Sequence, residues 1–160
     1  MGGGGSNSTL TISNIFNIDG SKATILKNQI ILQANPFNNY KPFIPEISNQ
    51  SKLFNKSSQI FPDKSDTKTA IPSVLYVKFS PDTVIDGNTF TLTHKNDQAY
   101  AIVLDHSPRV RITNNTFNGF KVPILMDQWS SIIDDKGNVL NSNQFAGDVT
   151  MNRKGEIVKK

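Results

Sequence analysis

A short pattern that recurs four times along the chain constrains its fold more than any other feature. Each copy has an aliphatic residue, an asparagine three positions later, and a large apolar residue two positions after the asparagine. The asparagines are Asn28, Asn88, Asn115 and Asn143, separated by 60, 27 and 28 residues. Two steps near 27 residues predict a repeat protein with one turn of chain per repeat, and the step of 60 predicts one repeat plus an insertion.

Apolar and polar residues alternate within each copy, which is the pattern of a β-strand. A second strand is predicted before each of the last three copies, over 74–78, 101–105 and 123–127. Stacked copies of such strands would form parallel sheets with neighbours about 4.8 Å apart. The asparagine amides would then bond from copy to copy, and Phe90, Phe117 and Phe145 would stack inside. The residues expected to face the core on the second strands are Leu75, Val77, Ile102, Leu104, Ile124 and Met126.

Two of these copies carry a resemblance to a known group of proteins. Residues 84–90 (Val-Ile-Asp-Gly-Asn-Thr-Phe) and 111–117 (Arg-Ile-Thr-Asn-Asn-Thr-Phe) resemble the repeats of right-handed parallel β-helix proteins of the pectate-lyase-like group. Residues 111–125 and 143–149 are similar to the last coils of bacterial α-1,3-galactosidases, the glycoside hydrolases of family 110. The resemblance implies an all-β fold, a short right-handed parallel β-helix (solenoid) of about four coils. It also implies a carbohydrate ligand outside the cytoplasm, but no catalytic motif of these families is present.

One long insertion interrupts the repeat. We predict residues 1–6 (MGGGGS) to be an expression linker and residues 7–160 to form a single β-helix domain, with the insertion at 34–72. Five prolines and many polar residues predict that the insertion is an extended loop. Its aromatic residues either attach the loop to the flank of the coils or form a sugar-stacking platform, for which Tyr40 and Phe43 are the candidates.

Both ends of a solenoid this short need a cover. Three explanations are open: the chain is part of a longer protein, it forms a homo-oligomer, or the insertion and the tail act as caps. The alternation Val149-Thr150-Met151 predicts a final edge strand in the tail. Apolar residues at Tyr76, Val103 and Leu125 on the outer side of the second strands also require a cover, from the insertion or from another chain.

Composition excludes several classes of function. The net charge is only +4, from 17 Lys and Arg against 13 Asp and Glu, and no basic cluster concentrates it, which disfavours nucleic-acid binding. There are no cysteines for disulfides or zinc sites, and no apolar run near the roughly 20 residues that span a membrane. Phosphate-binding loops and histidine-rich metal motifs are missing, so we expect no cofactor and no metal.

Acidic residues at the ends of the second strands are the candidate chemistry. The strand alignment places Lys78, Asp105 and Asp127 at one outward position of successive coils. Neighbouring carboxylates about 4.8 Å apart per coil suit a catalytic acid/base pair, for which we name Asp105 and Asp127, or a calcium site. Alternatively, Lys78 neutralises Asp105 and Asp127 is solvated, in which case the row only keeps this flank soluble.

Three further residues have two interpretations each. Arg111 either binds an acidic sugar or keeps its face hydrated, and Lys78 is a further substrate-binding candidate. Trp129, the only tryptophan, either stacks on a sugar or is buried against the turn. His106 follows Asp105 directly, and we expect a hydrogen-bonded structural histidine in a turn more than a base.

The sequence therefore favours a carbohydrate-active domain of an extracellular or cell-surface protein, with the periplasm as another location. The leading hypothesis is part of a glycosidase acting on an oligo- or polysaccharide. The alternatives are a non-catalytic module for glycan binding, adhesion or assembly, and an excised or engineered structural scaffold.

Overall fold

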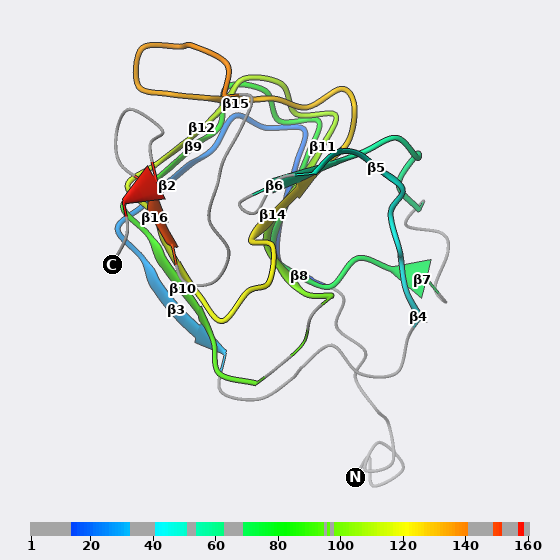
Figure 1. Ribbon diagram of the computed structural model, residues 1–160. Coiled ribbons are helices and arrows are strands. Elements are labelled where there is room, and N and C mark those ends of the chain that lie inside the picture. Colours follow the sequence, from blue (N-terminus) through cyan, green and yellow to red (C-terminus); the bar gives the residue numbers. More distant parts are fainter. Residues whose placement is uncertain are drawn as a thin grey trace, which may run out of the picture.

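The computed structural model describes residues 14–32, 41–50, 54–62, 69–94, 96, 98–140, 149–151 and 157–158. All regular structure in these ranges is β-strand, without a helix, so the expected all-β class is confirmed. The strands form four separate sheets in which most pairings are parallel (Figure 1). The predicted linker at residues 1–6 lies outside the described residues. Within them, no helix is long and apolar enough to cross a membrane.

The largest sheet has six strands in the order β1, β8, β11, β14, β6, β5. Its pairings are parallel except for that of β5 with β6. The strands are β1 Asn14–Asp19, β5 Ile47–Gln50, β6 Phe54–Ser57, β8 Ser73–Lys78, β11 Tyr100–Asp105 and β14 Ile124–Met126.

The other sheets have four strands (order β15, β12, β9, β2), five strands (order β17, β16, β13, β10, β3) and two strands (β4, β7). The strands of the four-stranded sheet are β2 Thr24–Leu26, β9 Val84–Asp86, β12 Val110–Thr113 and β15 Ile132–Ile133. Those of the five-stranded sheet are β3 Gln29–Leu32, β10 Thr89–Leu92, β13 Thr116–Asn118, β16 Val149–Met151 and β17 Ile157–Val158. The two-stranded sheet pairs β4 Lys41–Pro42 with β7 Thr69–Ala70.

The chain passes through the three larger sheets repeatedly and in the same order, and we call each passage a circuit. The first circuit is β1, β2 and β3, the second is β8, β9 and β10, and the third is β11, β12 and β13. β14 and β15 belong to a fourth. Each strand pairs in parallel with its counterpart in the next circuit, which places equivalent residues side by side.

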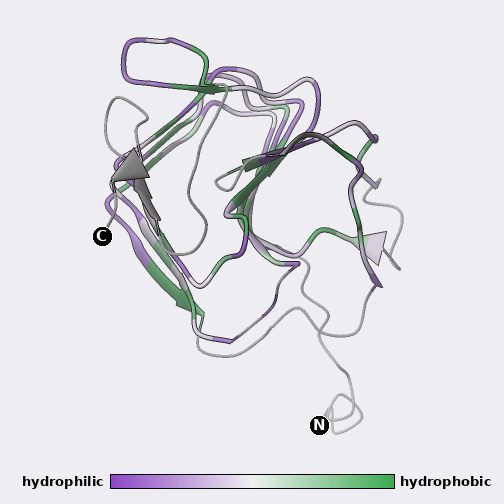
Figure 2. Cartoon of the chain, viewed as in Figure 1, coloured by the Kyte–Doolittle hydropathy of each residue, from purple (hydrophilic) through white to green (hydrophobic). Residues whose placement is uncertain are grey.

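The register of the largest sheet agrees with the sequence prediction. Leu75 pairs with Ile102, and Ile102 pairs with Ile124. All six residues expected to face inward on these strands belong to the main core cluster. Figure 2 shows hydrophobic residues along β6 and β14 and hydrophilic ones along many of the bends between strands. The predicted period of two therefore holds without a one-residue slip, which would have turned every side chain to the other face.

Asparagine side chains connect the circuits where β2, β9 and β12 end. Asn28 donates from its backbone N–H and its amide to Asn88 Oδ1, at 2.9 and 3.0 Å. Asn88 donates in the same way to Asn115 Oδ1, at 2.8 and 3.0 Å. Asn88 and Asn115 are fully buried, so each amide satisfies backbone groups that water cannot reach. This confirms the predicted amide row for three copies, and the fourth asparagine, Asn143, lies outside the described residues.

A second row, of serines, was not predicted. The backbone N–H of Ser21 donates to Ser80 Oγ, that of Ser80 to Ser107 Oγ, and that of Ser107 to Ser130 Oγ, at 3.2, 3.1 and 3.0 Å. Ser80, Ser107 and Ser130 are buried. The row therefore satisfies the backbone at the bends that follow the strands of the largest sheet.

The aromatic stack inside the core is confirmed for the described residues. The rings of Phe90 and Phe117 are stacked at 5.5 Å with 12° between their planes, and both are fully buried. Ile30 is the counterpart of Phe90 in the first circuit. Phe145, the third expected member, lies outside the described residues.

The prediction that residues 34–72 form an extended loop is wrong in part, because this segment supplies strands β4 to β7. β6 pairs in parallel with β14, so the segment adds a strand beyond the fourth circuit. Phe54 of β6 is 2% exposed and joins the main core. The burial of Phe54 and the ladder hydrogen bonds to β14 stabilise a strand here, although the proline-rich composition of the insertion predicted a loop. The insertion therefore caps one edge of this sheet.

The insertion also covers the outer apolar stripe. Tyr76, Val103 and Leu125 form a second cluster that includes Phe61 and has Phe43 packed against it. The rings of Phe43 and Phe61 meet edge to face at 5.8 Å. These contacts fit the expectation that the aromatic residues attach the insertion to the flank. Phe37 and Tyr40 lie outside the described residues.

The fourth copy of the repeat is aligned differently from the prediction. The strand that pairs with Val110 and Arg111 is Ile132–Ile133, whereas the sequence pattern assigned this position to residues 138–140. Asp134 Oδ1 accepts the backbone N–H groups of Lys136 and Asn138, at 2.9 and 2.8 Å. This turn reverses the chain, so that Val139 bridges antiparallel to Ile133. The spacing of the repeat alone could not show that the paired strand lies before this turn and not after it.

The two ends of the stack differ. At the late end, β16 pairs antiparallel with β13, which confirms a strand at the predicted place in the tail. It is not the edge strand, because β17 pairs with its other side. At the first circuit a groove of about 520 Å³ is lined by apolar residues that include Ile18, Ile25 and Ile30. Only the late end is covered by antiparallel strands among the described residues.

The asparagine row makes a testable prediction for stability. Replacing Asn88 by Ala removes an acceptor shared by two donors and the amide that donates to two partly buried backbone carbonyls, so we expect a loss of about 3 kcal/mol in the free energy of unfolding. Asn28→Ala is the matched control, because Asn28 is the exposed first member of the row, and it should cost less than about 1 kcal/mol. Urea unfolding followed by circular dichroism measures both. Equal losses would contradict the role of the buried amide.

Candidate functional site

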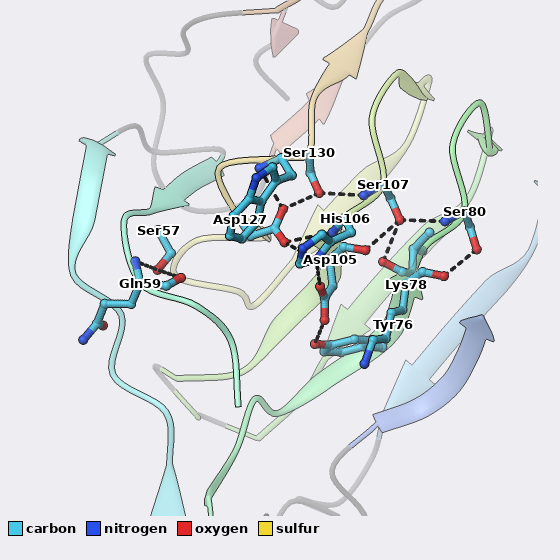
Figure 3. A network of polar contacts seen from close by, with 12 residues as sticks. Ser57, Gln59, Tyr76, Lys78, Ser80, Asp105, His106, Ser107, Asp127 and Ser130 are labelled. Carbon is cyan, nitrogen blue, oxygen red and sulfur yellow. Dashed lines mark hydrogen bonds and ion pairs between the residues drawn. The ribbon is translucent and has the colours of Figure 1, made fainter. Parts of the chain in front are cut away.

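The predicted acidic residues meet where β11 and β14 end. Asp105 is the last residue of β11 and pairs in register with Lys78. Asp127 follows β14 directly, and its backbone N–H donates to the carbonyl of Leu104. The three residues therefore occupy one position of successive circuits, as the alignment predicted, and Figure 3 shows Asp105 and Asp127 close together.

Both carboxylates are buried, although they point away from the main core. Asp105 is 5% exposed and Asp127 is 1% exposed. Asp127 Oδ1 accepts the hydroxyl of Ser130 at 2.7 Å and the N–H of Trp129 at 3.2 Å, and Oδ2 accepts the N–H of His106 at 2.8 Å. The expectation that Asp127 is solvated is thus wrong, because the bend that follows it folds back over the carboxylate. Asp127 is also the last acceptor of the serine row.

Asp105 is held by two side chains. Its Oδ2 accepts the Tyr76 hydroxyl at 2.7 Å, and its Oδ1 lies 2.6 Å from His106 Nδ1. Asp127 Oδ2 lies 3.1 Å from the same nitrogen. No ion pair joins Lys78 to Asp105, so the alternative that Lys78 neutralises this carboxylate is not what the structure shows. The Lys78 ammonium instead lies 5.5 Å from the centre of the Phe79 ring.

Aromatic rings form a row over these carboxylates. The His106 ring is stacked on Trp129, with 4.4 Å between the ring centres and 14° between the planes, and the Phe79 ring lies 4.9 Å from His106 at 41°. Phe79 is 50% exposed and Trp129 is 44% exposed. Phe79 and His106 have positive φ angles of 47° and 48°. This left-handed backbone bends the chain sharply after β8 and after β11 and turns both rings to the same side.

Burial shifts two ionisable groups of the site. Burial and the neighbouring Asp105 raise the pKa of the Tyr76 hydroxyl far above its ordinary value of 10.0. Burial likewise raises the pKa of Asp127, against the opposing effect of the Ser130 and His106 hydrogen bonds. Tyr76 therefore remains a neutral donor to Asp105 over the whole physiological range.

Three side chains of the site could act as ligands to a cation. Asp105, His106 and Asp127 each offer an atom within 4.8 Å of the others. The carboxylate oxygens, however, already accept hydrogen bonds from Tyr76, Ser130 and the backbone of the bend. A bound cation would have to displace these donors, so the geometry fits a hydrogen-bonded network better than a metal centre.

The other predicted binding residues are divided between different places. Trp129 lies directly at the site and is not buried against the turn. Arg111 lies on β12 in the four-stranded sheet, between Val84 and Ile133, and away from the strand ends that carry the carboxylates. Phe43 packs in the second cluster on the flank. Tyr40 lies outside the described residues.

Sequence reasoning underestimated His106 and did not associate Tyr76 with the site. His106 is half-buried in a turn, as expected, but it contacts both carboxylates as well as Trp129. A signal existed, because Tyr76 and Lys78 occupy the same strand positions as Val103 and Asp105. The sequence could not show that the Tyr76 side chain, two positions before Lys78 on β8, reaches Asp105 on the neighbouring strand.

No protein-family model, curated protein or solved structure matches the chain. The candidate site therefore stands on its own geometry.

Removal of the Tyr76 hydroxyl tests the network. Tyr76→Phe leaves Asp105 Oδ2 without its donor in a buried position, and we expect a loss of about 1–3 kcal/mol in the free energy of unfolding at pH 7. Tyr100→Phe is the control, because Tyr100 is also a buried tyrosine of the second cluster but its hydroxyl has no hydrogen-bond partner among the described residues. It should change stability by less than about 0.5 kcal/mol. Urea unfolding of both variants measures the two changes. A Tyr76→Phe variant as stable as the wild type would contradict the role of the hydroxyl in the network.

Alkaline pH gives an independent prediction. A pKa that is higher in the folded state than in the unfolded state contributes stability below the unfolded value of 10.0, and this contribution is lost as the pH rises further. The stability advantage of the wild type over Tyr76→Phe should therefore shrink above about pH 10. Urea unfolding at several values between pH 8 and pH 11 measures it. An advantage that grows with pH would contradict the direction of the shift.

Proposed function

We propose that the chain is a carbohydrate-active domain whose circuits form a short right-handed parallel β-helix. The parallel pairing of each circuit with the next, in three sheets, supports this architecture. The asparagine and serine rows support it as well, since they repeat at the same place in successive circuits. The right hand follows the general preference of crossovers between parallel strands. The likeness of residues 84–90 and 111–117 to pectate-lyase-like repeats points the same way.

The proposed ligand is an oligo- or polysaccharide bound at Trp129 and His106. The observation that carries this proposal is the exposed Trp129 ring stacked on His106, whose Nδ1 contacts two buried carboxylates. One face of Trp129 is covered by the histidine, and the other face meets no aromatic ring among the described residues. An apolar ring face beside polar groups suits a sugar, which presents both C–H surfaces and hydroxyls.

We further propose that the domain is part of an extracellular or cell-surface glycosidase in which Asp105 and Asp127 form the acid/base pair. In support, an oxygen of each carboxylate lies within 4.8 Å of the other. The two carboxyl groups of retaining glycosidases are about 5–5.5 Å apart. Burial also raises the pKa of Asp127, which is the direction a general acid needs.

A second candidate function, non-catalytic glycan binding, is favoured by one observation. Asp127 is 1% exposed and both of its oxygens already accept hydrogen bonds, so a substrate has no open oxygen to approach. In this case Asp105 and Asp127 position the bend that carries His106 and Trp129, and the ligand is held without cleavage.

A panel of oligosaccharides tests both proposals. Binding to immobilised glycans and product formation by mass spectrometry are measured for the wild type, Trp129→Ala and Asp105→Asn. We expect Trp129→Ala to weaken binding at least about tenfold, equivalent to about 1.4 kcal/mol, because it removes the stacking face. Phe16→Ala is the control, since Phe16 is 51% exposed but lies on β1, at the first circuit.

The outcomes separate the two functions. Cleavage by the wild type that Asp105→Asn abolishes supports the glycosidase. Binding without products supports the non-catalytic module. Absence of both across the panel, or equal effects of Trp129→Ala and Phe16→Ala, would overturn the glycan site.

A further inference from the structure

We propose that His106 is the polar residue through which this site contacts its ligand: Asp105 and Asp127 hold the ring by Nδ1, and Nε2 accepts a hydrogen bond from a glycan hydroxyl. The inference rests on the proposed glycan site and names the group that acts in it. It applies to the non-catalytic form of that site, in which Asp105 and Asp127 are positioning residues for the histidine and not an acid/base pair.

The tautomer follows from the neighbours of Nδ1. Asp105 Oδ1 lies 2.6 Å from this nitrogen and Asp127 Oδ2 lies 3.1 Å from it. Carboxylate oxygens are acceptors, so a short contact with two of them requires the proton to be on Nδ1. In the neutral ring the lone pair is then on Nε2, as in other histidines whose Nδ1–H is held by a carboxylate.

Nε2 is the open nitrogen of the ring. It makes no hydrogen bond, and the only buried side-chain nitrogen or oxygen without a partner among the described residues is Arg111 Nε. Nε2 is therefore in contact with solvent, in a side chain that is 35% exposed. Trp129 is stacked on the ring and Phe79 is tilted against it, so Nε2 on the ring edge is the polar atom that a ligand can reach.

Several contacts hold the ring in this orientation. The backbone N–H of His106 donates to Asp127 Oδ2, and Tyr76 fixes the second oxygen of Asp105. Stacking on Trp129 restricts rotation of the ring. An acceptor that is held in place loses little freedom when a ligand binds, which is the property expected of a recognition group.

The direct test is nitrogen NMR of protein labelled with ¹⁵N in histidine. Long-range ¹H–¹⁵N spectra distinguish a protonated ring nitrogen from an unprotonated one. When the imidazole ring is neutral, we expect His106 Nδ1 to be protonated and Nε2 to be unprotonated. Titration with a glycan that binds should shift the Nε2 resonance and leave Nδ1 nearly unchanged. A protonated Nε2 in the neutral ring, or an Nε2 that does not respond to a bound glycan, would overturn the proposal.

His106→Asn is the informative variant. Asparagine tolerates the left-handed backbone at φ 48°, and its amide can still donate to Asp105, but it has no counterpart of Nε2. We expect the variant to fold and to bind the glycan at least about tenfold more weakly. Lys27→Asn, at φ 53° in the first circuit, controls for introducing asparagine at such a bend and should leave binding unchanged.

This design separates failure of the inference from failure of the glycan site. If Trp129→Ala weakens binding and His106→Asn does not, the glycan site stands and the role of His106 is overturned. If the wild type binds no glycan of the panel, the proposed function fails, and the role assigned to Nε2 fails with it. Should His106→Asn not fold, the response of Nε2 in the wild type still decides.

Discussion

The fold depends on one constraint: each bend between strands leaves backbone groups that only the next circuit can satisfy. Asparagine and serine side chains meet this requirement at two different bends. Asn88 Oδ1 accepts the backbone N–H of Asn28, and the backbone N–H of Asn88 donates to Asn115 Oδ1. Ser80 and Ser107 accept backbone N–H groups in the same way on another side of the stack. Because an unpaired buried group costs about 1–3 kcal/mol, these rows help to fix the register of the three larger sheets.

The candidate site is built on the end of one of these rows. Ser130 accepts the N–H of Ser107 and donates its hydroxyl to Asp127, so the serine row ends at a buried carboxylate. The same carboxylate holds the backbone of His106. The scaffold and the site therefore share hydrogen bonds, and the orientation of the exposed rings is a consequence of how the circuits are held together.

The period of two in the strands could be read from the sequence, and with it the inward residues of β8, β11 and β14. It could be read because a buried face imposes a strict alternation that any slip destroys. The insertion could not be read in the same way. Its prolines predicted a loop, but Phe54 and its neighbours form β6 because β14 presents an unpaired edge, which is a fact of the assembled sheet. The late alignment at residues 138–140 failed for a similar reason, since the turn at Asp134 reverses the chain locally.

The sequence by itself determined the all-β class, the parallel register of the central circuits and the neighbourhood of Asp105 and Asp127. These follow from a spacing of 27 residues and from alternation, which are properties of the chain. Only the tertiary structure decided what surrounds the two carboxylates. Their burial, the hydroxyl of Tyr76 and the stack of His106 on Trp129 depend on bends with left-handed backbone, whose direction no periodic pattern encodes. The physical reason is that the repeat fixes where strands and bends occur, whereas the contacts between side chains at a bend depend on how the circuits pack.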